Sequence, residues 1–282
     1  DGKDWRNLDG VCYMAPEKNF VPPADAIELP SFMEVSAPTK EGKAAFARAF
    51  KIFSENQDPA TARTLLQKTD NRYLVHNRPA KVLDEKELDE IYSTRWMLDA
   101  PPAIRKKGDI RALDTIRFGI TTHRGCYGQC NFCAIAVHQG RRIVSRSEKS
   151  IVEEARRMSA HPKWRGTISD VGGPTANMYG FDCEKKKTAG ACTNRRCLFP
   201  SVCRFLGVDH TRQMRLLKEL RSLPNVRNVF VSSGIRPDLV AADEKHGDGY
   251  IEAIVRNHVS GQLKLAPEHT CAHVLECMGK PG

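Results

Sequence analysis

The sequence predicts an α/β fold in which β-strands and helices alternate along the second half of the chain. Two observations predict it. Runs rich in apolar and β-branched residues recur at 115–122, 167–171, 226–232 and 262–266, and segments with apolar residues at helical spacing follow them. Repeated strand–helix units favour a parallel sheet with right-handed crossovers. Four such units are too few to close an eight-stranded barrel.

The predicted helices of this half have recognisable starts. Ser150 and Glu153 have the spacing of a capping box, which predicts a helix from that point. Asp209 is expected to cap the next helix, since an aspartate side chain accepts hydrogen bonds from free backbone N–H groups. Residues 249–258 and 270–278 show the same helical spacing.

The first hundred residues are organised differently. Residues 1–38 are rich in turn-forming residues and are expected to be irregular. Helical spacing predicts a helix over 40–54. This helix carries three phenylalanines that are interpreted as core, Phe46, Phe50 and Phe53. A short strand is predicted at 72–76, and a helix capped by Asp84 is predicted over 85–92.

A proline pair and a charged segment predict a domain boundary near residue 108. Pro101-Pro102 is followed by the charged stretch 105–109. We therefore expect an N-terminal extension, irregular and helical, over 1–108 and a second domain over 109–282, with a cysteine-rich insertion at about 181–205. The chain has no starting methionine and stops after a helix-like segment, so a piece truncated at both ends is expected.

Composition is that of a soluble globular protein. Of the 282 residues, 40% are hydrophobic and 28% are charged. No run approaches the roughly 20 apolar residues of a membrane helix, and the N-terminus lacks the apolar region of a secretory signal. A cytoplasmic protein without a membrane partner is therefore expected. The net charge of +10 fits an anionic partner such as RNA or a phosphorylated metabolite, although a solvated basic surface is the favoured interpretation.

Three cysteines have a spacing that suits a compact set of thiolate ligands. Three residues separate Cys126 from Cys130, and two separate Cys130 from Cys133. Three thiolates can hold three irons of a [4Fe–4S] cluster and leave the fourth iron open for chemistry. The alternative is a structural zinc site with His123 or His138 as fourth ligand, but zinc sites more often pair two C-x-x-C knuckles. The spacing therefore favours iron–sulfur, and the short spacings among the ten cysteines favour metal ligands over disulfides.

The cysteine loop and several later segments resemble a known superfamily. The C-x-x-x-C-x-x-C spacing, with the aromatic Phe132 before the last cysteine, resembles the signature of the radical S-adenosylmethionine superfamily. Further segments resemble its YgiQ-like branch: Thr122–Cys126, Phe132–Ile135, His138–Arg141, Gly172–Gly180, Ser232–Arg236 and Leu265–His269. The resemblance is strong over the second half of the chain and weak over the first hundred residues.

This resemblance implies a fold, cofactors and a reaction. The superfamily has a partial (β/α) TIM-like barrel, so the chain is expected to stop short of the last units. The open iron of a [4Fe–4S] cluster would bind S-adenosylmethionine, and one-electron reduction would cleave it to a 5′-deoxyadenosyl radical, with flavodoxin or ferredoxin as electron donor. The substrate and the catalytic residues are unknown. Likeness to tRNA methylthiotransferases makes RNA one option, beside a metabolite or a peptide. The competing interpretation is a zinc-stabilised nucleic-acid-binding module without radical chemistry.

A glycine pair is the first candidate for binding S-adenosylmethionine. Gly172-Gly173 follows the second predicted strand, and active sites of barrel folds lie at the C-terminal ends of strands. The pair resembles the glycine motif that receives the methionine amino group, although Pro174 stands where many relatives carry Glu. Glycine permits a close approach of ligand and backbone. A simple tight turn is the alternative.

Four more candidates follow the third and fourth predicted strands. Ser232 and Ser233 are expected to bind ribose or methionine oxygens, with strand-end capping as the alternative. Arg236 is expected to pair with the methionine carboxylate, for which a guanidinium is well suited. Glu268 is expected to bind ribose hydroxyls or to act on substrate, and a surface salt bridge is an equally good interpretation.

A second group of cysteines lies in the basic insertion. Its members are Cys183, Cys192, Cys197 and Cys203. An auxiliary iron–sulfur cluster, a structural zinc and unligated thiols all remain open, and the clustering favours a bound metal. The absence of a C-x-x-C knuckle disfavours a zinc ribbon.

Overall fold

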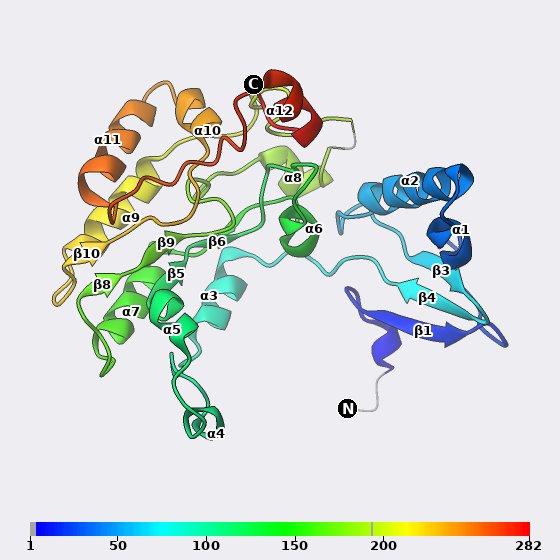
Figure 1. Ribbon diagram of the computed structural model, residues 1–282, viewed down its shortest axis with the longest axis horizontal. Helices are drawn as coiled ribbons and strands as arrows, with labels where there is room; N and C mark the ends of the chain where they lie inside the picture. Colours follow the sequence, from blue (N-terminus) through cyan, green and yellow to red (C-terminus); the bar gives the residue numbers. More distant parts are fainter. Residues whose placement is uncertain (1–3, 193) are drawn as a thin grey trace. The chain divides into compact units, whose positions relative to one another are not determined.

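The computed structural model describes residues 4–192 and 194–282, which form two compact units (Figure 1). The first unit is the chain up to Val82 together with the segment Glu184–Asn194. The second unit consists of Leu83–Cys183 and Arg195–Gly282. No helix among the described residues combines the length and the apolar character that a bilayer crossing requires.

The division of the chain comes at Val82 and not at the expected residue 108. Helix α3 (Glu85–Ser93) explains the difference, because its side chains bond to the second unit. Asp89 accepts a hydrogen bond from the Ser147 backbone at 3.0 Å, and the guanidinium of Arg146 lies 4.1 Å from the ring centre of Tyr92. The proline pair after α3 therefore lies within the second unit, where Pro101 precedes and Pro102 begins α4 (Pro102–Arg105).

The first unit is built on a four-stranded sheet in the order β1-β4-β3-β2. Strand β4 pairs antiparallel with β1 and β3, and β2 pairs parallel with β3. The elements of this unit are η1 (Trp5–Asn7), β1 (Cys12–Pro16), β2 (Ile27–Leu29), α1 (Phe32–Ser36), α2 (Lys40–Glu55), β3 (Leu65–Thr69), β4 (Arg72–His76) and α8 (Glu184–Ala189). Ala15, Leu66 and Val75 form its buried cluster.

The expectation that residues 1–38 are irregular is wrong, since they contain β1, β2 and α1. Prolines interrupt this region, and only Ala15 of β1 is fully buried, so no apolar alternation marks the strand. Strand β1 is held instead by its five-residue pairing with β4, which is a long-range contact. The predicted strand at 72–76 and the predicted helices at 40–54 and 85–92 are confirmed.

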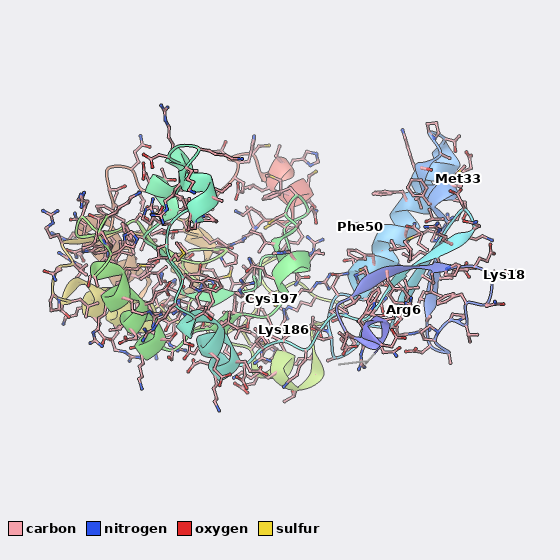
Figure 2. All side chains as sticks on the ribbon, turned by 90° about the horizontal axis from the view of Figure 1, so that it is seen from below. Arg6, Lys18, Met33, Phe50, Lys186 and Cys197 are labelled. Carbon is pink, nitrogen blue, oxygen red and sulfur yellow. The ribbon has the colours of Figure 1, made fainter. Side chains whose placement is uncertain are left out.

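Two of the three phenylalanines of α2 are not core, which corrects a second expectation, whereas Phe53 is half-buried with its ring 5.8 Å from that of His76. The buried face of this helix consists of small residues, Gly42, Ala45 and Ala49. A Cβ on Gly42 would lie 2.1 Å from the Ala37 carbonyl oxygen, so the close contact there admits only glycine. Phe46 and Phe50 are 60% and 57% exposed, and Figure 2 marks Phe50 on α2.

The second unit alternates short strands with helices. Its strands are β5 (Gly119–Thr121), β6 (His123–Arg124), β7 (Val144–Ser145), β8 (Thr167–Ile168), β9 (Asp170–Gly172) and β10 (Asn228–Val229). Its helices after α3 are α4 (Pro102–Arg105), α5 (Arg111–Ile116), α6 (Ile135–Gln139), α7 (Glu148–Ser159), α9 (Thr211–Arg221), α10 (Pro237–Ala242), α11 (Gly247–Asn257) and α12 (Ala272–Met278).

Parallel pairing relates the successive strands of this unit. Strand β5 pairs with β9 and β8 pairs with β10, both parallel, and Ile235 forms a parallel bridge with Leu265. A backbone hydrogen bond of 2.9 Å from Val171 to Phe230 joins the two pairs. The predicted parallel α/β arrangement is present, and the described residues form no closed barrel. The strands are shorter than predicted: Thr115 belongs to α5, and 262–266 contributes a single bridge.

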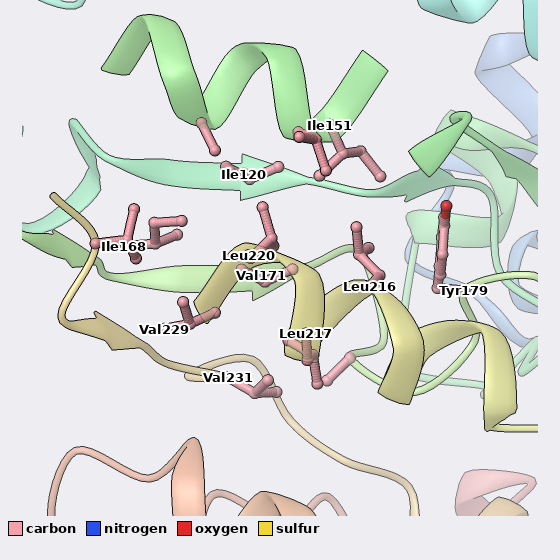
Figure 3. Close-up of a cluster of buried hydrophobic side chains, with 14 of the residues drawn as sticks. Ile120, Ile151, Ile168, Val171, Tyr179, Leu216, Leu217, Leu220, Val229 and Val231 are labelled. Carbon is pink, nitrogen blue, oxygen red and sulfur yellow. The ribbon is translucent and has the colours of Figure 1, made fainter. Parts of the chain in front are cut away.

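The core of the second unit lies between the strands and two helices (Figure 3). Ile120, Val171 and Val231 are buried there with Ile151 of α7 and Leu217 of α9. Because successive strand residues point to opposite faces, their neighbours Thr121, Gly172 and Ser232 lie on the face away from these helices. These three neighbours line a pocket. The alternation therefore places apolar residues in the core and small or polar residues at the pocket.

Helix starts follow the expected chemistry with one correction. Asp84 and Glu87 form a capping box at α3. Helix α7 is capped by Ser147 and not by Ser150, because the Ser147 side chain accepts a hydrogen bond from the Ser150 backbone at 3.1 Å. Asp209 accepts a hydrogen bond from the backbone of Thr211 at 2.8 Å, at the start of α9.

Candidate functional site

The cysteine loop follows β6 and is held in shape by its own backbone. The Cys126 N–H donates to the Gly140 carbonyl at 3.2 Å, and the Gly125 N–H donates to the Gln139 side chain at 3.3 Å. Gly125 has a φ of +83°, and a Cβ there would lie 1.8 Å from the Arg142 carbonyl oxygen. Only glycine accommodates both conditions. These contacts therefore fix the backbone at Gly125, where the cysteine loop begins.

Two of the three predicted ligand sulfurs flank Gly128. A Cβ on Gly128 would lie 3.2 Å from the Cys126 Sγ and 3.4 Å from the Cys130 Sγ. The Gly128 N–H donates to the Cys126 sulfur at 3.3 Å, while burial raises the pKa of the Cys126 thiol. The soft sulfur donors suit an iron–sulfur cluster, and the Arg236 guanidinium lies beside the same glycine, 3.3 Å from that Cβ position.

Cys133 and Phe132 complete the loop. The Cys133 N–H donates to the Cys130 carbonyl at 3.1 Å, Cys133 is half-buried, and Phe132 is 54% exposed. Within 4–192 and 194–282, no three His, Cys, Asp or Glu side chains are already arranged around one metal position. The assignment of a cluster therefore depends on the donor set and on the spacing of the three cysteines in the chain.

The C-terminal end of α12 contacts the same loop. The Asn131 backbone donates to the Met278 carbonyl at 2.9 Å, and the Asn131 side chain donates to the Cys277 carbonyl at 2.8 Å. These carbonyls belong to the last turn of a helix, where intrahelical donors are missing. Nothing in the sequence pattern indicated this contact, because it joins residues nearly 150 positions apart.

A pocket of about 790 Å³ brings four predicted residues together: Gly172, Gly173, Ser232 and Ser233. They come from the ends of two strand segments that are neighbours in the sheet. Gln139 also lines this pocket, together with Arg124 and Asp170, which were not singled out from sequence as ligand-binding residues. The volume falls within the range of small-molecule sites, roughly 300–1,000 Å³.

Asp170 holds the serine pair in place. Its Oδ1 accepts hydrogen bonds from the backbone of Ser232 at 2.8 Å and of Ser233 at 3.1 Å, and its Oδ2 accepts from the Ser233 hydroxyl. The Ser232 hydroxyl donates to the Ser169 carbonyl at 2.7 Å. Both hydroxyls therefore donate within the protein and present their oxygen lone pairs as acceptors. Asp170 could have been noticed in the sequence, because it is an acidic residue within the apolar run of a predicted strand.

The two glycines have neighbours that explain their small size. A Cβ on Gly172 would lie 3.1 Å from the Ser233 hydroxyl, and one on Gly173 would lie 2.6 Å from the His123 ring. His123 is fully buried, and burial lowers its pKa to about 4, so the ring is neutral near pH 7. The Gly172 carbonyl already accepts hydrogen bonds from Thr122, from its N–H at 2.7 Å and its hydroxyl at 3.1 Å.

Gly173→Ala is expected to lower the free energy of unfolding by about 1–3 kcal/mol, since the added methyl overlaps the His123 ring. Urea unfolding measures this loss. The loss is expected to shrink when His123→Ala is the background, because the ring is then absent. The control is Gly249→Ala, where a Cβ meets nothing within 4 Å. An equal loss in both backgrounds would show that the ring is not the reason for the glycine.

Arg236 and Glu268 lie among other partners. The Arg236 guanidinium pairs with Asp238 at 2.5 Å and donates to the Cys130 sulfur at 3.5 Å, and its residue is 3% exposed. Glu268 pairs with Lys280 at 3.2 Å, which is the salt bridge that the sequence left open. Neither residue is among those that line the pocket. In this structure the carboxylate that pairs with Arg236 is that of Asp238.

The second group of cysteines is divided between the units. Cys183 and Cys197 are buried in one apolar cluster of the second unit, with Cys203 packed against it. Cys126 and Tyr127 of the cysteine loop belong to the same cluster. Cys192 belongs to the segment of the first unit. The structure therefore groups three of the four thiols beside the base of the cysteine loop.

Known proteins resemble this chain along its whole length. The family described as Radical SAM N-terminal matches residues 1–119. A UPF0313 protein of Fusobacterium nucleatum is 50% identical over 282 residues, which are 100% of this chain and 48% of that protein. UPF0313 proteins of Clostridium perfringens and Methanocella arvoryzae are 43% and 48% identical, over 100% and 92% of this chain and 41% of each protein. The chain thus spans less than half the length of these relatives.

Proposed function

Because the chain belongs to the YgiQ-like branch of the radical S-adenosylmethionine superfamily, we propose that it is the cofactor-binding part of an enzyme that cleaves S-adenosylmethionine reductively. The observation that carries the proposal is the loop in which the Cys126 and Cys130 sulfurs flank Gly128, next to a pocket lined by Gly172 and Ser233. Cys126, Cys130 and Cys133 would hold a [4Fe–4S] cluster, which would supply the one electron that breaks the sulfonium C–S bond of bound S-adenosylmethionine, giving methionine and a 5′-deoxyadenosyl radical.

The residues of the loop hold and tune the metal. Cys126, Cys130 and Cys133 serve as thiolate ligands. Arg236 donates toward the Cys130 sulfur at 3.5 Å, and the Gly128 N–H donates toward the Cys126 sulfur at 3.3 Å. Hydrogen bonds to ligand sulfurs stabilise added negative charge and so influence the reduction potential. The exposed Phe132 ring remains at the loop surface, available to a bound ligand.

The pocket residues bind and orient the adenosyl and methionine groups. The hydroxyl oxygens of Ser232 and Ser233 accept hydrogen bonds from ribose, since both hydroxyl protons are used toward Ser169 and Asp170. Gly172 and Gly173 line the pocket without side chains, so the ligand can approach their backbone closely. Glu268 is paired with Lys280 and is not among the residues that line the pocket, so we assign it no contact with ribose there.

The proposal also covers the electron donor, the cellular location, the substrate and the barrel fold. We assign electron supply to a small donor such as flavodoxin or ferredoxin and a cytoplasmic location. The substrate is undefined, and RNA stays an option because the chain carries a net charge of +10. We also propose a TIM-like partial barrel as the fold. Four parallel segments in sequential order support it.

Anaerobic reconstitution with iron and sulfide tests the proposal. The expected result is an absorbance shoulder that dithionite bleaches, followed by release of 5′-deoxyadenosine from S-adenosylmethionine. Stoichiometric zinc without such turnover would contradict it and favour a metal-stabilised binding module.

A second metal is proposed at the buried thiols. Cys183, Cys197 and Cys203 belong to one cluster of side chains in the second unit. Metal analysis of a triple variant without Cys126, Cys130 and Cys133 is expected to find residual iron or zinc. Complete loss of bound metal would show that the insertion carries free thiols only.

A further inference from the structure

We propose that Arg124 binds the carboxylate of the ligand that occupies the pocket, in the place that sequence reasoning gave to Arg236. This inference rests on the proposed function, which supplies S-adenosylmethionine as the ligand. Arg124 is the only basic residue among the described residues that line the pocket. A carboxylate that enters the pocket can therefore pair with Arg124 alone, because the other charged residues of the lining, Asp114 and Asp170, are acidic.

The guanidinium of Arg124 is available for such a contact. It is exposed, and within the described part of the chain no acidic side chain pairs with it. Arg236 is in the opposite situation, because it is 3% exposed and bonded to Asp238 and Cys130. An arginine that is already paired and buried has little left for a ligand, whereas an unpaired one can form a bidentate contact with a carboxylate.

The backbone holds Arg124 in a defined position. It lies in β6, where its backbone pairs antiparallel with Val144. Gly125 follows with φ +83° beneath the Arg142 carbonyl, and Gln139 accepts the Gly125 N–H. The base of the side chain is therefore fixed before any ligand arrives, which lowers the entropic cost of binding.

Its place relative to the cysteines fits an amino-acid group. Arg124 stands two residues before Cys126, and Gln139, whose side chain accepts the Gly125 N–H, lines the same pocket. Adenosine carries no acid, so the carboxylate is the one anionic group of S-adenosylmethionine. Of the two acidic residues in the lining, Asp170 accepts hydrogen bonds from Ser232 and Ser233, and Asp114 lies 3.9 Å from the Arg117 guanidinium. Within the described residues, neither pairs with Arg124.

The test compares two ligands on two proteins after anaerobic reconstitution. Calorimetry measures the affinity of the parent protein and of Arg124→Gln for S-adenosylmethionine and for decarboxylated S-adenosylmethionine. We expect Arg124→Gln to weaken binding of S-adenosylmethionine on the order of 10- to 100-fold, the loss of a charge-assisted pair. Binding of the decarboxylated ligand is expected to change less than about threefold, because it lacks the group that Arg124 contacts.

Two further variants control the result. Arg124→Lys keeps the charge and is expected to recover part of the affinity. Arg221→Gln removes an exposed arginine at the end of α9 and is expected to leave both affinities unchanged. Iron content and the absorbance of the cluster, measured on each variant, are expected to match the parent, since the cysteines are intact.

The outcomes separate this inference from the proposed function. If the parent binds S-adenosylmethionine and Arg124→Gln binds it equally well, the assignment of Arg124 is wrong and the proposed function stands. An equal loss for both ligands would show that Arg124 supports the pocket without contacting the carboxylate. If the reconstituted parent binds neither ligand, the proposed function fails and the assignment fails with it.

Discussion

Replacement of Cys126, Cys130 or Cys133 by alanine, one at a time, is expected to abolish the cluster of the loop and reduce cleavage of S-adenosylmethionine to background. Each variant leaves two thiolates for a cluster that needs three protein ligands. Iron analysis after anaerobic reconstitution and detection of 5′-deoxyadenosine by chromatography measure the two effects. A second metal at the buried thiols would leave residual iron, so cleavage is the decisive measurement.

The matched control is Cys12→Ala. Cys12 is exposed on β1 of the first unit and stands outside every cysteine group described above. Its removal is expected to leave iron content and cleavage at the parent level. Full cleavage by any variant of the three loop cysteines would overturn the assignment of the ligands.

Gly125→Ala is expected to prevent assembly of the cluster although all three cysteines remain. The new Cβ would lie 1.8 Å from the Arg142 carbonyl oxygen, and the residue would have to keep a φ of +83°. The positive φ alone costs about 1–2 kcal/mol, and overpacking against a backbone atom adds about 1–3 kcal/mol or more. The loop must therefore change its path, which separates the sulfurs.

Gly140→Ala separates the two costs of that substitution. Gly140 has a similar φ of +94°, but a Cβ there meets nothing within 4 Å. Its variant is expected to lose modest stability and to keep the cluster. Circular dichroism confirms that both variants are folded, and iron content then compares them. Parent-level iron in Gly125→Ala would show that the loop tolerates a different path.

The outcome for the fold shows where sequence patterns were informative. The helices at 40–54 and 85–92 were predicted correctly because spacing and capping are local properties of the chain. Strand β1 was missed because only one of its residues is fully buried and its stability comes from pairing with β4. The phenylalanines of α2 were placed in the core because spacing predicts a face and cannot say which neighbours that face meets.

The cysteine loop stands apart, since its candidate ligands could be named from spacing alone. Cys126, Cys130 and Cys133 lie within eight consecutive residues, and their proximity is a consequence of the short chain between them. The pocket residues Gly172 and Ser233 were named through resemblance and through their position after predicted strands. The structure places both on one pocket because their strand segments are neighbours.

The sequence by itself indicated the candidate donor set of the loop, the main helices and the alternation of strands and helices, because each depends on residues close together in the chain. Only the tertiary structure decided the partners of side chains that come from distant segments. Asp170 meets Ser232 and Ser233 from 62 and 63 residues away, and the Arg236 guanidinium meets Cys130 from 106 residues away. Such pairs depend on which strand ends become neighbours on folding, and no local pattern encodes that choice.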